Sequence, residues 1–296
     1  MDTESKYKNR AVDTEAGHRS LEISVKCGSM SDIMLGRESR EIVGEHRAYG
    51  VDTELFSLAV AAALRIPTSG IGTLSEKRVH AALKYYVQPD MKKHEVKICG
   101  FVSDALSEDG VFEIQTGAFR RLSGKLDVLL KSGTVTVVYP VICEKTLYTT
   151  DTDTGETSVR KSPKKRTVYN VFSELYALRR FLPSTNLRLR LITLKADEHR
   201  AVRTHVSKAG KKRALTVSSD LIPTVICDDV TLCSYTDYLN LLPSDLPDVF
   251  TSSDLSYRLK ISRSLSSTML LILTDLSVVE RIGKSGRSYL YRVTPK

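Results

Sequence analysis

The stretch FVSDALSEDGVFEIQTG, residues 101–117, decides how this chain is interpreted. Two runs of β-prone residues flank the letters SEDG, and Asp109-Gly110 is a strong signal for a tight turn. A two-residue loop pairs position 104 with 115, and a four-residue loop pairs it with 113. Because side chains alternate between the faces of a strand, either register places Asp104, Glu113 and Gln115 on one face of a hairpin.

These carboxylates favour a cation site. In a strand predicted over 94–106, Asp104 falls on the apolar row that begins at Val96. Two carboxylates a few ångströms apart repel each other unless a cation lies between them, and magnesium prefers such oxygen ligands. Glu76 is a third candidate acid, on a preceding helix. Thr73 to Glu76 also fits a capping box, and the two roles of Glu76 are compatible.

The rest of the chain predicts an α/β domain. Residues 1–50 are polar and are expected to form a loosely ordered tail, and residues 67–73 a linker. The continuous apolar run TVTVVYPVI, 134–142, is typical of a strand covered on both faces. The order of elements favours a mixed sheet flanked by helices. The predicted helices are 52–65, 74–87, 118–131 and 168–181, the predicted strands are 94–106, 111–117, 134–142 and 186–195, and a hairpin is predicted around 151–155.

Composition excludes several other classes of protein. The chain has 296 residues, and no window reaches the roughly 18 consecutive apolar residues of a membrane-spanning helix. Its five cysteines are scattered without Cys-x-x-Cys spacing, which favours reduced thiols in the cytoplasm over a disulfide framework or a zinc site. We therefore expect a cytoplasmic protein that has no membrane partner.

The acids and their surroundings resemble a nuclease family. A helix with Glu76, then Asp104, then Glu113-x-Gln115 across a hairpin, then a helix and a buried strand, resembles the PD-(D/E)XK nuclease superfamily over about residues 73–143. The wider string also looks like a group of uncharacterised prokaryotic proteins. The resemblance implies a restriction-endonuclease-like mixed sheet over residues 51–242. It also implies that Asp104 and Glu113 bind Mg²⁺ or Mn²⁺, with Glu76 supporting the site.

The chain departs from the superfamily pattern at one position. Gln115 stands where the motif usually has lysine, and an amide carries no positive charge. Lys125, on the following helix, is the candidate replacement, and a solvated helix face is the alternative interpretation. The departure leaves two hypotheses open: a Mg²⁺-dependent DNA endonuclease, and a non-catalytic DNA-binding regulator with an inactive nuclease-like domain.

The C-terminal sequence resembles a winged helix-turn-helix domain, assigned to residues 243–296. Residues 250–293 predict two helices joined by a short turn and then two strands around the basic loop GKSGR. The resemblance implies that the second helix enters the major groove and that the loop contacts phosphate. A protein-docking role is the alternative. The implied contact residues are Arg263, Ser264, Ser267, Thr268, Lys284, Ser285 and Arg287.

Net charge supports a nucleic-acid partner. Residues 158–213 contain 16 Lys and Arg against three acids, and residues 258–296 contain eight against two. Such basic clusters are typical of polyanion binding, although they also keep loops solvated. The basic loop with Lys164, Lys165 and Arg166 is a further candidate DNA contact. We therefore expect DNA as the partner, association with the nucleoid when DNA is bound, and a homodimer if both strands are cut.

Overall fold

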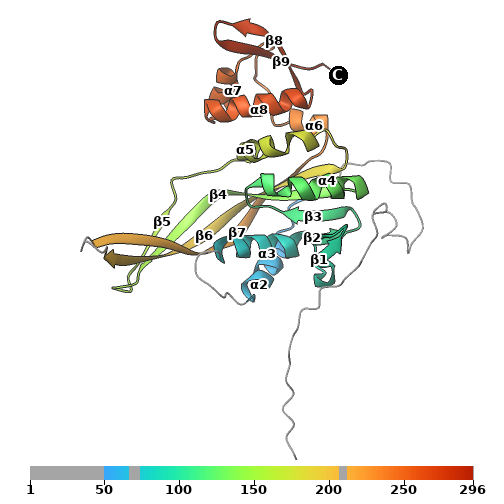
Figure 1. The fold of residues 1–296 in the computed structure, drawn as a ribbon. Helices are drawn as coiled ribbons and strands as arrows, with labels where there is room; N and C mark the ends of the chain where they lie inside the picture. The colour runs from blue at the N-terminus through green and yellow to red at the C-terminus, as the bar shows by residue number, and fades with distance from the viewer. Residues whose placement is uncertain (1–49, 67–73, 207–211, 296) are drawn as a thin grey trace, which may run out of the picture.

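The computed structural model describes residues 50–66, 74–206 and 212–295 (Figure 1). The expected tail over 1–50 and the linker 67–73 lie outside the described residues, apart from Gly50. The helices are α2 (Thr53–Leu64), α3 (Leu74–Val87), η1 (Met91–Lys93), η2 (Phe119–Leu122), α4 (Ser123–Ser132), η3 (Val168–Asn170), α5 (Val171–Leu175), η4 (Tyr176–Phe181), α6 (Tyr235–Leu239), α7 (Ser252–Leu259) and α8 (Arg263–Asp275). The strands are β1 (His94–Ile98), β2 (Phe101–Ser107), β3 (Gly110–Ile114), β4 (Val135–Asp151), β5 (Thr157–Lys161), β6 (Leu187–Val206), β7 (Lys212–Leu232), β8 (Val279–Ser285) and β9 (Ser288–Val293).

Strands β1 to β7 form one mixed sheet. Its order is β1-β2-β3-β4-β6-β7, with β5 paired to β4 outside this path. The β3–β4 and β4–β6 pairs are parallel and the other pairs are antiparallel. Parallel neighbours need crossover connections, which α4 and the η3–α5–η4 segment supply. The predicted mixed sheet with flanking helices is confirmed, while the helix predicted over 168–181 is divided into these three short segments.

Helices cover both faces of the sheet. Val137 and Val138, neighbours on β4, belong to different hydrophobic clusters because successive side chains point to opposite faces. The cluster of Val137 includes Leu126 of α4, and the cluster of Val138 includes Leu83 of α3. Figure 1 shows α4 and α3 on the two sides of the sheet accordingly. The prediction that strand 134–142 is covered on both faces is therefore confirmed.

The single strand predicted over 94–106 is wrong. Cys99 and Gly100 take positive φ values of 47° and 84°, so the chain reverses and β1 pairs antiparallel with β2. The reversal resets the alternation of side chains: Ile98 is buried, whereas Val102 is 59% exposed. The apolar row that was extended from Val96 to Asp104 does not exist. A non-glycine residue at positive φ is uncommon, which is why the sequence pattern concealed this turn.

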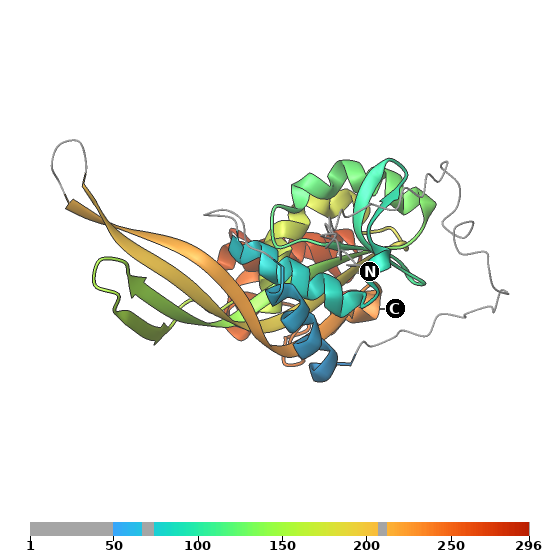
Figure 2. The same ribbon diagram turned by 90° about the horizontal axis from the view of Figure 1, so that it is seen from below.

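Long ribbons extend the sheet beyond its helical part (Figure 2). Strand β6 continues to Val206 instead of ending near 195, and it pairs with β7, for which no strand was predicted. Large apolar side chains on β7 are partly exposed, with Leu215 at 47% and Val225 at 46%. A strand outside the core lacks the alternation that marks a half-buried strand, so the pattern predicted no strand here. Residues 207–211, between β6 and β7, lie outside the described part of the chain.

The C-terminal unit, defined here as residues 250–293, has the predicted order of two helices and a hairpin. The N-caps of α7 and α8 are Thr251 and Ser262, whose hydroxyls accept backbone N–H groups of the first turns. Met269 and Leu273 of α8 are fully buried. Strands β8 and β9 then form a separate two-stranded sheet.

The C-terminal unit packs on the η3–α5–η4 segment. Its buried residues share one hydrophobic cluster with those of α4 and α5, so the apolar core continues from the sheet into α8. At the edge of this contact Arg179 donates to both carboxylate oxygens of Asp275, at 2.6 and 2.9 Å. The unit is thereby attached to the side of the sheet that carries α4 (Figure 1).

Candidate functional site

The hairpin of β2 and β3 aligns the two acids. Its pairs run from Ser107–Gly110 to Ala105–Phe112, a register in which position 104 lies opposite 113. Gly110 has a φ of 119°, and a Cβ there would collide with the Thr134 carbonyl oxygen, so only glycine fits. Of the two predicted registers, the structure has the one with 104 opposite 113, but the loop that produces it contains two residues, Glu108 and Asp109, and not the expected four.

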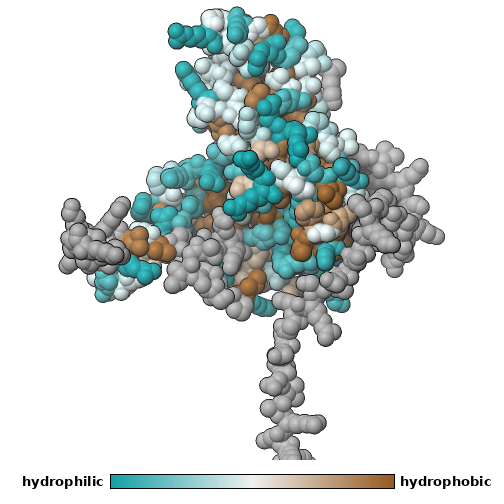
Figure 3. All heavy atoms as spheres, viewed as in Figure 1, coloured by the Kyte–Doolittle hydropathy of each residue, from teal (hydrophilic) through white to brown (hydrophobic). Residues whose placement is uncertain are grey.

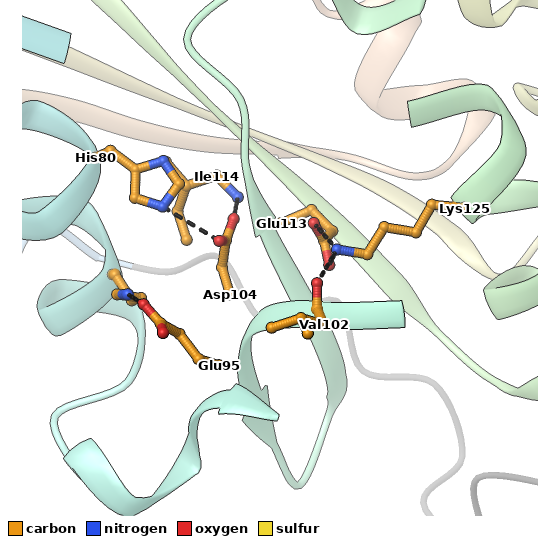
Figure 4. Close-up of polar contacts among 8 residues, drawn as sticks. His80, Glu95, Val102, Asp104, Glu113, Ile114 and Lys125 are labelled. Atoms are coloured by element: carbon orange, nitrogen blue, oxygen red, sulfur yellow. Dashed lines mark hydrogen bonds and ion pairs between the residues drawn. The ribbon is translucent and has the colours of Figure 1, made fainter. Parts of the chain in front are cut away.

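Asp104 lies where β2 and β3 separate. Its Oδ2 accepts the Ile114 N–H at 2.7 Å, taking the place of a strand carbonyl, and its Oδ1 lies 3.2 Å from His80 Nε2 (Figure 4). Burial by itself would raise the pKa of Asp104. The hydrogen bond and electrostatic interaction with His80, and the Ile114 amide, hold that pKa below its ordinary value. The Asp104 carboxylate is therefore ionised at neutral pH.

Glu113 forms a buried ion pair with Lys125. The Nζ atom lies 2.6 Å from each carboxylate oxygen, and it also donates to the Val102 carbonyl at 2.5 Å. The side chains of Glu113 and Lys125 are only 5% and 15% exposed, so the alternative of a solvated helix face for Lys125 is wrong. Burial raises the pKa of Glu113 above its ordinary value, although Lys125 opposes the shift and the charge of Asp104 adds to it.

The donor set suits a hard divalent cation. The charge of Asp104 raises the pKa of Glu113, and the Lys125 ammonium lowers the pKa of both acids. Lys125 donates a hydrogen bond to Oε2 of Glu113, and the buried Oε1 has no hydrogen-bond partner among the described residues. Among the described residues, no three His, Cys, Asp or Glu side chains form a group that could hold a metal ion. Mg²⁺ in proteins keeps several waters beside one or two carboxylates, so Asp104 and Glu113 are the residues that could hold it.

A third acid continues the row across the sheet. Glu95 of β1 lies opposite Asp104, because the flanking pairs are His94–Ala105 and Val96–Ser103. Its backbone takes a φ of 52°, and its carboxylate accepts from Lys84 Nζ at 2.8 Å. Three acids on neighbouring strands are thus each matched by a base from α3 or α4 (Figure 4).

The other two predicted site residues are Gln115 and Glu76. The Gln115 side chain donates its amide N–H to the Gly117 carbonyl oxygen. Its backbone N–H donates to the Val138 carbonyl oxygen at 2.9 Å. Neither acid is its hydrogen-bond partner in the described structure. Glu76 falls in the first turn of α3, and its side chain lies outside the described part, as does the predicted capping box.

His80 is the site residue that the sequence interpretation missed. It lies on α3 between the buried residues Val79 and Leu83 and points toward β2. A signal existed, since His80 is four residues after Glu76 and therefore on the same helix face. Its partner Asp104 is 24 residues away, a distance at which helix periodicity gives no information about contacts.

The predicted DNA-contact residues lie on the surface. Arg263, Ser264 and Ser267 at the start of α8 are exposed. Thr268 is half-buried, and its hydroxyl donates to the Ser264 carbonyl oxygen at 3.1 Å. In Figure 3 hydrophilic side chains project from the outer end of the C-terminal unit. The other predicted contact residues, on the β8–β9 hairpin and on the loop before η3, are also exposed: Lys284, Ser285, Arg287, Lys164, Lys165 and Arg166.

The hairpin also carries an aromatic–cation stack that was not predicted. The Arg281 guanidinium lies 3.7 Å from the Tyr289 ring centre, and Lys284 Nζ lies 4.7 Å from the same centre. Two cations are therefore held on one ring near the outer end of the unit.

Comparison with known proteins identifies the family without a function. Residues 77–233 match the model of Domain of unknown function (DUF8091), more than half of the chain, so the chain belongs to this family. That region contains His80, Asp104, Glu113 and Lys125. An uncharacterized protein of Treponema pallidum (strain Nichols) is 33% identical over 128 residues, 43% of this chain, and the chain spans about half (51%) of that relative. No solved structure matches. In the described part of the chain, none of the helices is long and apolar enough to cross a membrane.

Proposed function

We propose that this chain is a DNA-binding, Mg²⁺-dependent endonuclease of the restriction-endonuclease-like type. The order of elements supports the proposal: α3, the antiparallel strands β1 to β3, α4, and then β4 parallel to β3. The candidate acids Asp104 and Glu113 stand on the second and third strands of this series. This is the arrangement that the PD-(D/E)XK resemblance implies.

The observation that carries the proposal is the Lys125–Glu113 pair. A nuclease of this type needs a cation beside its acids, and Gln115 cannot supply it. Lys125 extends from α4 so that its Nζ is 2.6 Å from Glu113, with a side chain only 15% exposed. A lysine from the following helix thereby takes the role that the motif lysine has in the superfamily.

Each residue has a chemical role in this proposal. Asp104 and Glu113 hold the divalent ion with their carboxylate oxygens. The ion, when bound, polarises the scissile phosphate and lowers the pKa of the attacking water. Lys125 holds the water or a phosphate oxygen through its ammonium protons, and Glu76 supports the acids from α3. Gln115 keeps the loop after β3 in place through Gly117.

The C-terminal unit serves as the DNA anchor in this proposal. A helix pair followed by a basic hairpin supports a winged helix-turn-helix assignment, with α8 in the major groove and the β8–β9 hairpin on phosphate. Lys164, Lys165 and Arg166 extend the basic surface from the sheet part of the protein. A homodimer would supply two such sites for the two strands of a duplex, and a DNA partner would bring the protein to the nucleoid.

A second candidate is a non-catalytic DNA-binding regulator. The observation that favours it is Gln115, whose amide is bonded to Gly117 and not to an acid. In that case the Lys125–Glu113 pair is a structural ion pair, and the C-terminal unit carries the whole function.

A cleavage assay separates the two candidates. Plasmid, linear, branched and single-stranded DNA are incubated with the full chain in Mg²⁺ or Mn²⁺, beside Glu113→Gln and Lys125→Met proteins purified in parallel. Cutting by the wild type and by neither variant supports the endonuclease. Equal cutting by all three indicates a contaminating nuclease. DNA binding without any cutting favours the regulator.

A further inference from the structure

The imidazole of His80 contacts the acid pair and has no role in the proposal above. Val79 and Leu83 of α3 are buried against the sheet, at 2% and 0% exposure, so the helix backbone beside His80 is firmly anchored. From this position Nε2 reaches Oδ1 of Asp104 at 3.2 Å. Its side chain is 33% exposed, which places it at the rim of the site.

The hydrogen-bond roles at Asp104 follow from its charge. A carboxylate that binds a cation is ionised, and an ionised carboxylate can only accept hydrogen bonds. His80 Nε2 therefore carries the proton and donates. The other oxygen accepts from the Ile114 N–H at 2.7 Å. One donor on each oxygen, from a helix and from the neighbouring strand, sets the plane of the carboxylate.

A fixed carboxylate is what a metal site requires. Each oxygen retains a second lone pair after its hydrogen bond, so both remain able to bind a cation. Holding the group in one orientation before binding removes an entropic cost from the binding step. Imidazole is suited to this task, because its Nε2–H donates to one carboxylate oxygen and its rigid ring is carried on an anchored helix. Lys125 instead contacts Glu113 with a flexible ammonium group.

We propose that His80 is a positioning residue that orients Asp104 for divalent-cation binding, an inference that rests on the proposed function. In known metal sites the loss of such a supporting hydrogen bond costs about 10–100-fold in metal affinity. We expect a loss in that range when the imidazole is replaced by an apolar side chain. A glutamine, whose amide N–H can donate to the same oxygen, restores most of the affinity.

Mn²⁺ binding to the full chain, measured by paramagnetic resonance of the free ion, tests this without any cleavage. His80→Leu is compared with His80→Gln and with the matched control Lys84→Met. Lys84 lies one turn further along α3 and pairs with Glu95 at 2.8 Å, so its loss also removes a base beside an acid. Thermal unfolding without metal shows that each variant is folded.

The results separate the inference from the function on which it rests. Weaker binding by about tenfold or more in His80→Leu, with near-normal binding in His80→Gln and Lys84→Met, supports the positioning role. Equal affinity of wild type and His80→Leu overturns it and leaves the metal site intact. Equal losses in His80→Leu and Lys84→Met also overturn it, because the effect is then general electrostatics. Absence of Mn²⁺ binding by the wild type refutes the proposed function and this inference with it.

Discussion

Replacing Lys125 by methionine should destabilise the protein in a pH-dependent way. The substitution keeps the aliphatic length of the side chain and removes the ammonium from a carboxylate that is only 5% exposed. Glu113 must then either stay ionised without a counter-charge or take up a proton. Protonation costs about 1.4 kcal/mol of free energy for each unit by which the pH exceeds the pKa of Glu113. Loss of one partner of a buried pair costs about 3 kcal/mol or more. In a protein of this size that corresponds to a fall in Tm of roughly 6–12 °C.

The pH dependence has a definite sign. The pKa of Glu113 is raised in the folded state, so its contribution to stability is present at low pH and is lost as the pH rises through the folded-state pKa. Removing Lys125 raises that pKa further, because the ammonium opposes the shift in the wild type. The difference in unfolding free energy between wild type and Lys125→Met should therefore be large near pH 8 and should shrink toward pH 5.

Urea unfolding at these two pH values measures the effect. Lys84→Met is the matched control, because its partner Glu95 is 63% exposed and such pairs contribute at most about 1 kcal/mol. The double variant Glu113→Gln, Lys125→Met should recover most of the loss, since no buried charge remains. Equal costs for Lys125→Met and Lys84→Met at pH 8, or a loss that is the same at both pH values, would refute the reasoning.

Three further outcomes are expected. Arg190→Met leaves the fully buried Asp229 carboxylate without its bidentate partner and should cost about 3–5 kcal/mol of unfolding free energy in urea, whereas a cost below 1 kcal/mol would contradict a buried pair. Lys284→Ala and Arg287→Ala should each weaken duplex binding and reduce its salt slope by about one, and an unchanged slope would remove that residue from the phosphate contacts. Mn²⁺ affinity should begin to fall on acidification at a pH above 4.5, the ordinary pKa of glutamate, because the pKa of Glu113 is raised; an affinity that stays constant from pH 8 down to 4.5 would exclude Glu113 as a ligand.

Local patterns predicted the parts of the fold that local forces determine. The helix predicted over 74–87 has those bounds in the structure, because its apolar residues recur on one face that packs on the sheet. Strand β4 was visible as a continuous apolar run, since the helices on both faces bury it. In the C-terminal unit, Thr251 and Ser262 cap the two helices that were predicted within residues 250–293.

The errors arose where tertiary structure overrides local preference. The reversal at Cys99–Gly100 interrupts a run of β-prone residues. The alternation of side chains before it therefore does not predict which face the residues after it occupy. The sequence left two hairpin registers open for Asp104, and it did not predict the gap between the strands where its side chain meets Ile114. The contact of His80 with Asp104 depends on how α3 packs against β2, and that packing cannot be predicted from the spacing of residues in the sequence.

The two acids are held in different ways, and this difference explains their opposite pKa shifts. Asp104 is 23% exposed and receives two hydrogen-bond donors without a lysine in contact, so its ionised form is favoured and persists into the acidic range. Glu113 is 5% exposed, and even a lysine at 2.6 Å does not fully offset the cost of its burial. On acidification Glu113 therefore takes up its proton before Asp104 does. Any chemistry that needs both carboxylates ionised has an acid limit set by Glu113, and its burial sets that limit above the value for a solvated glutamate.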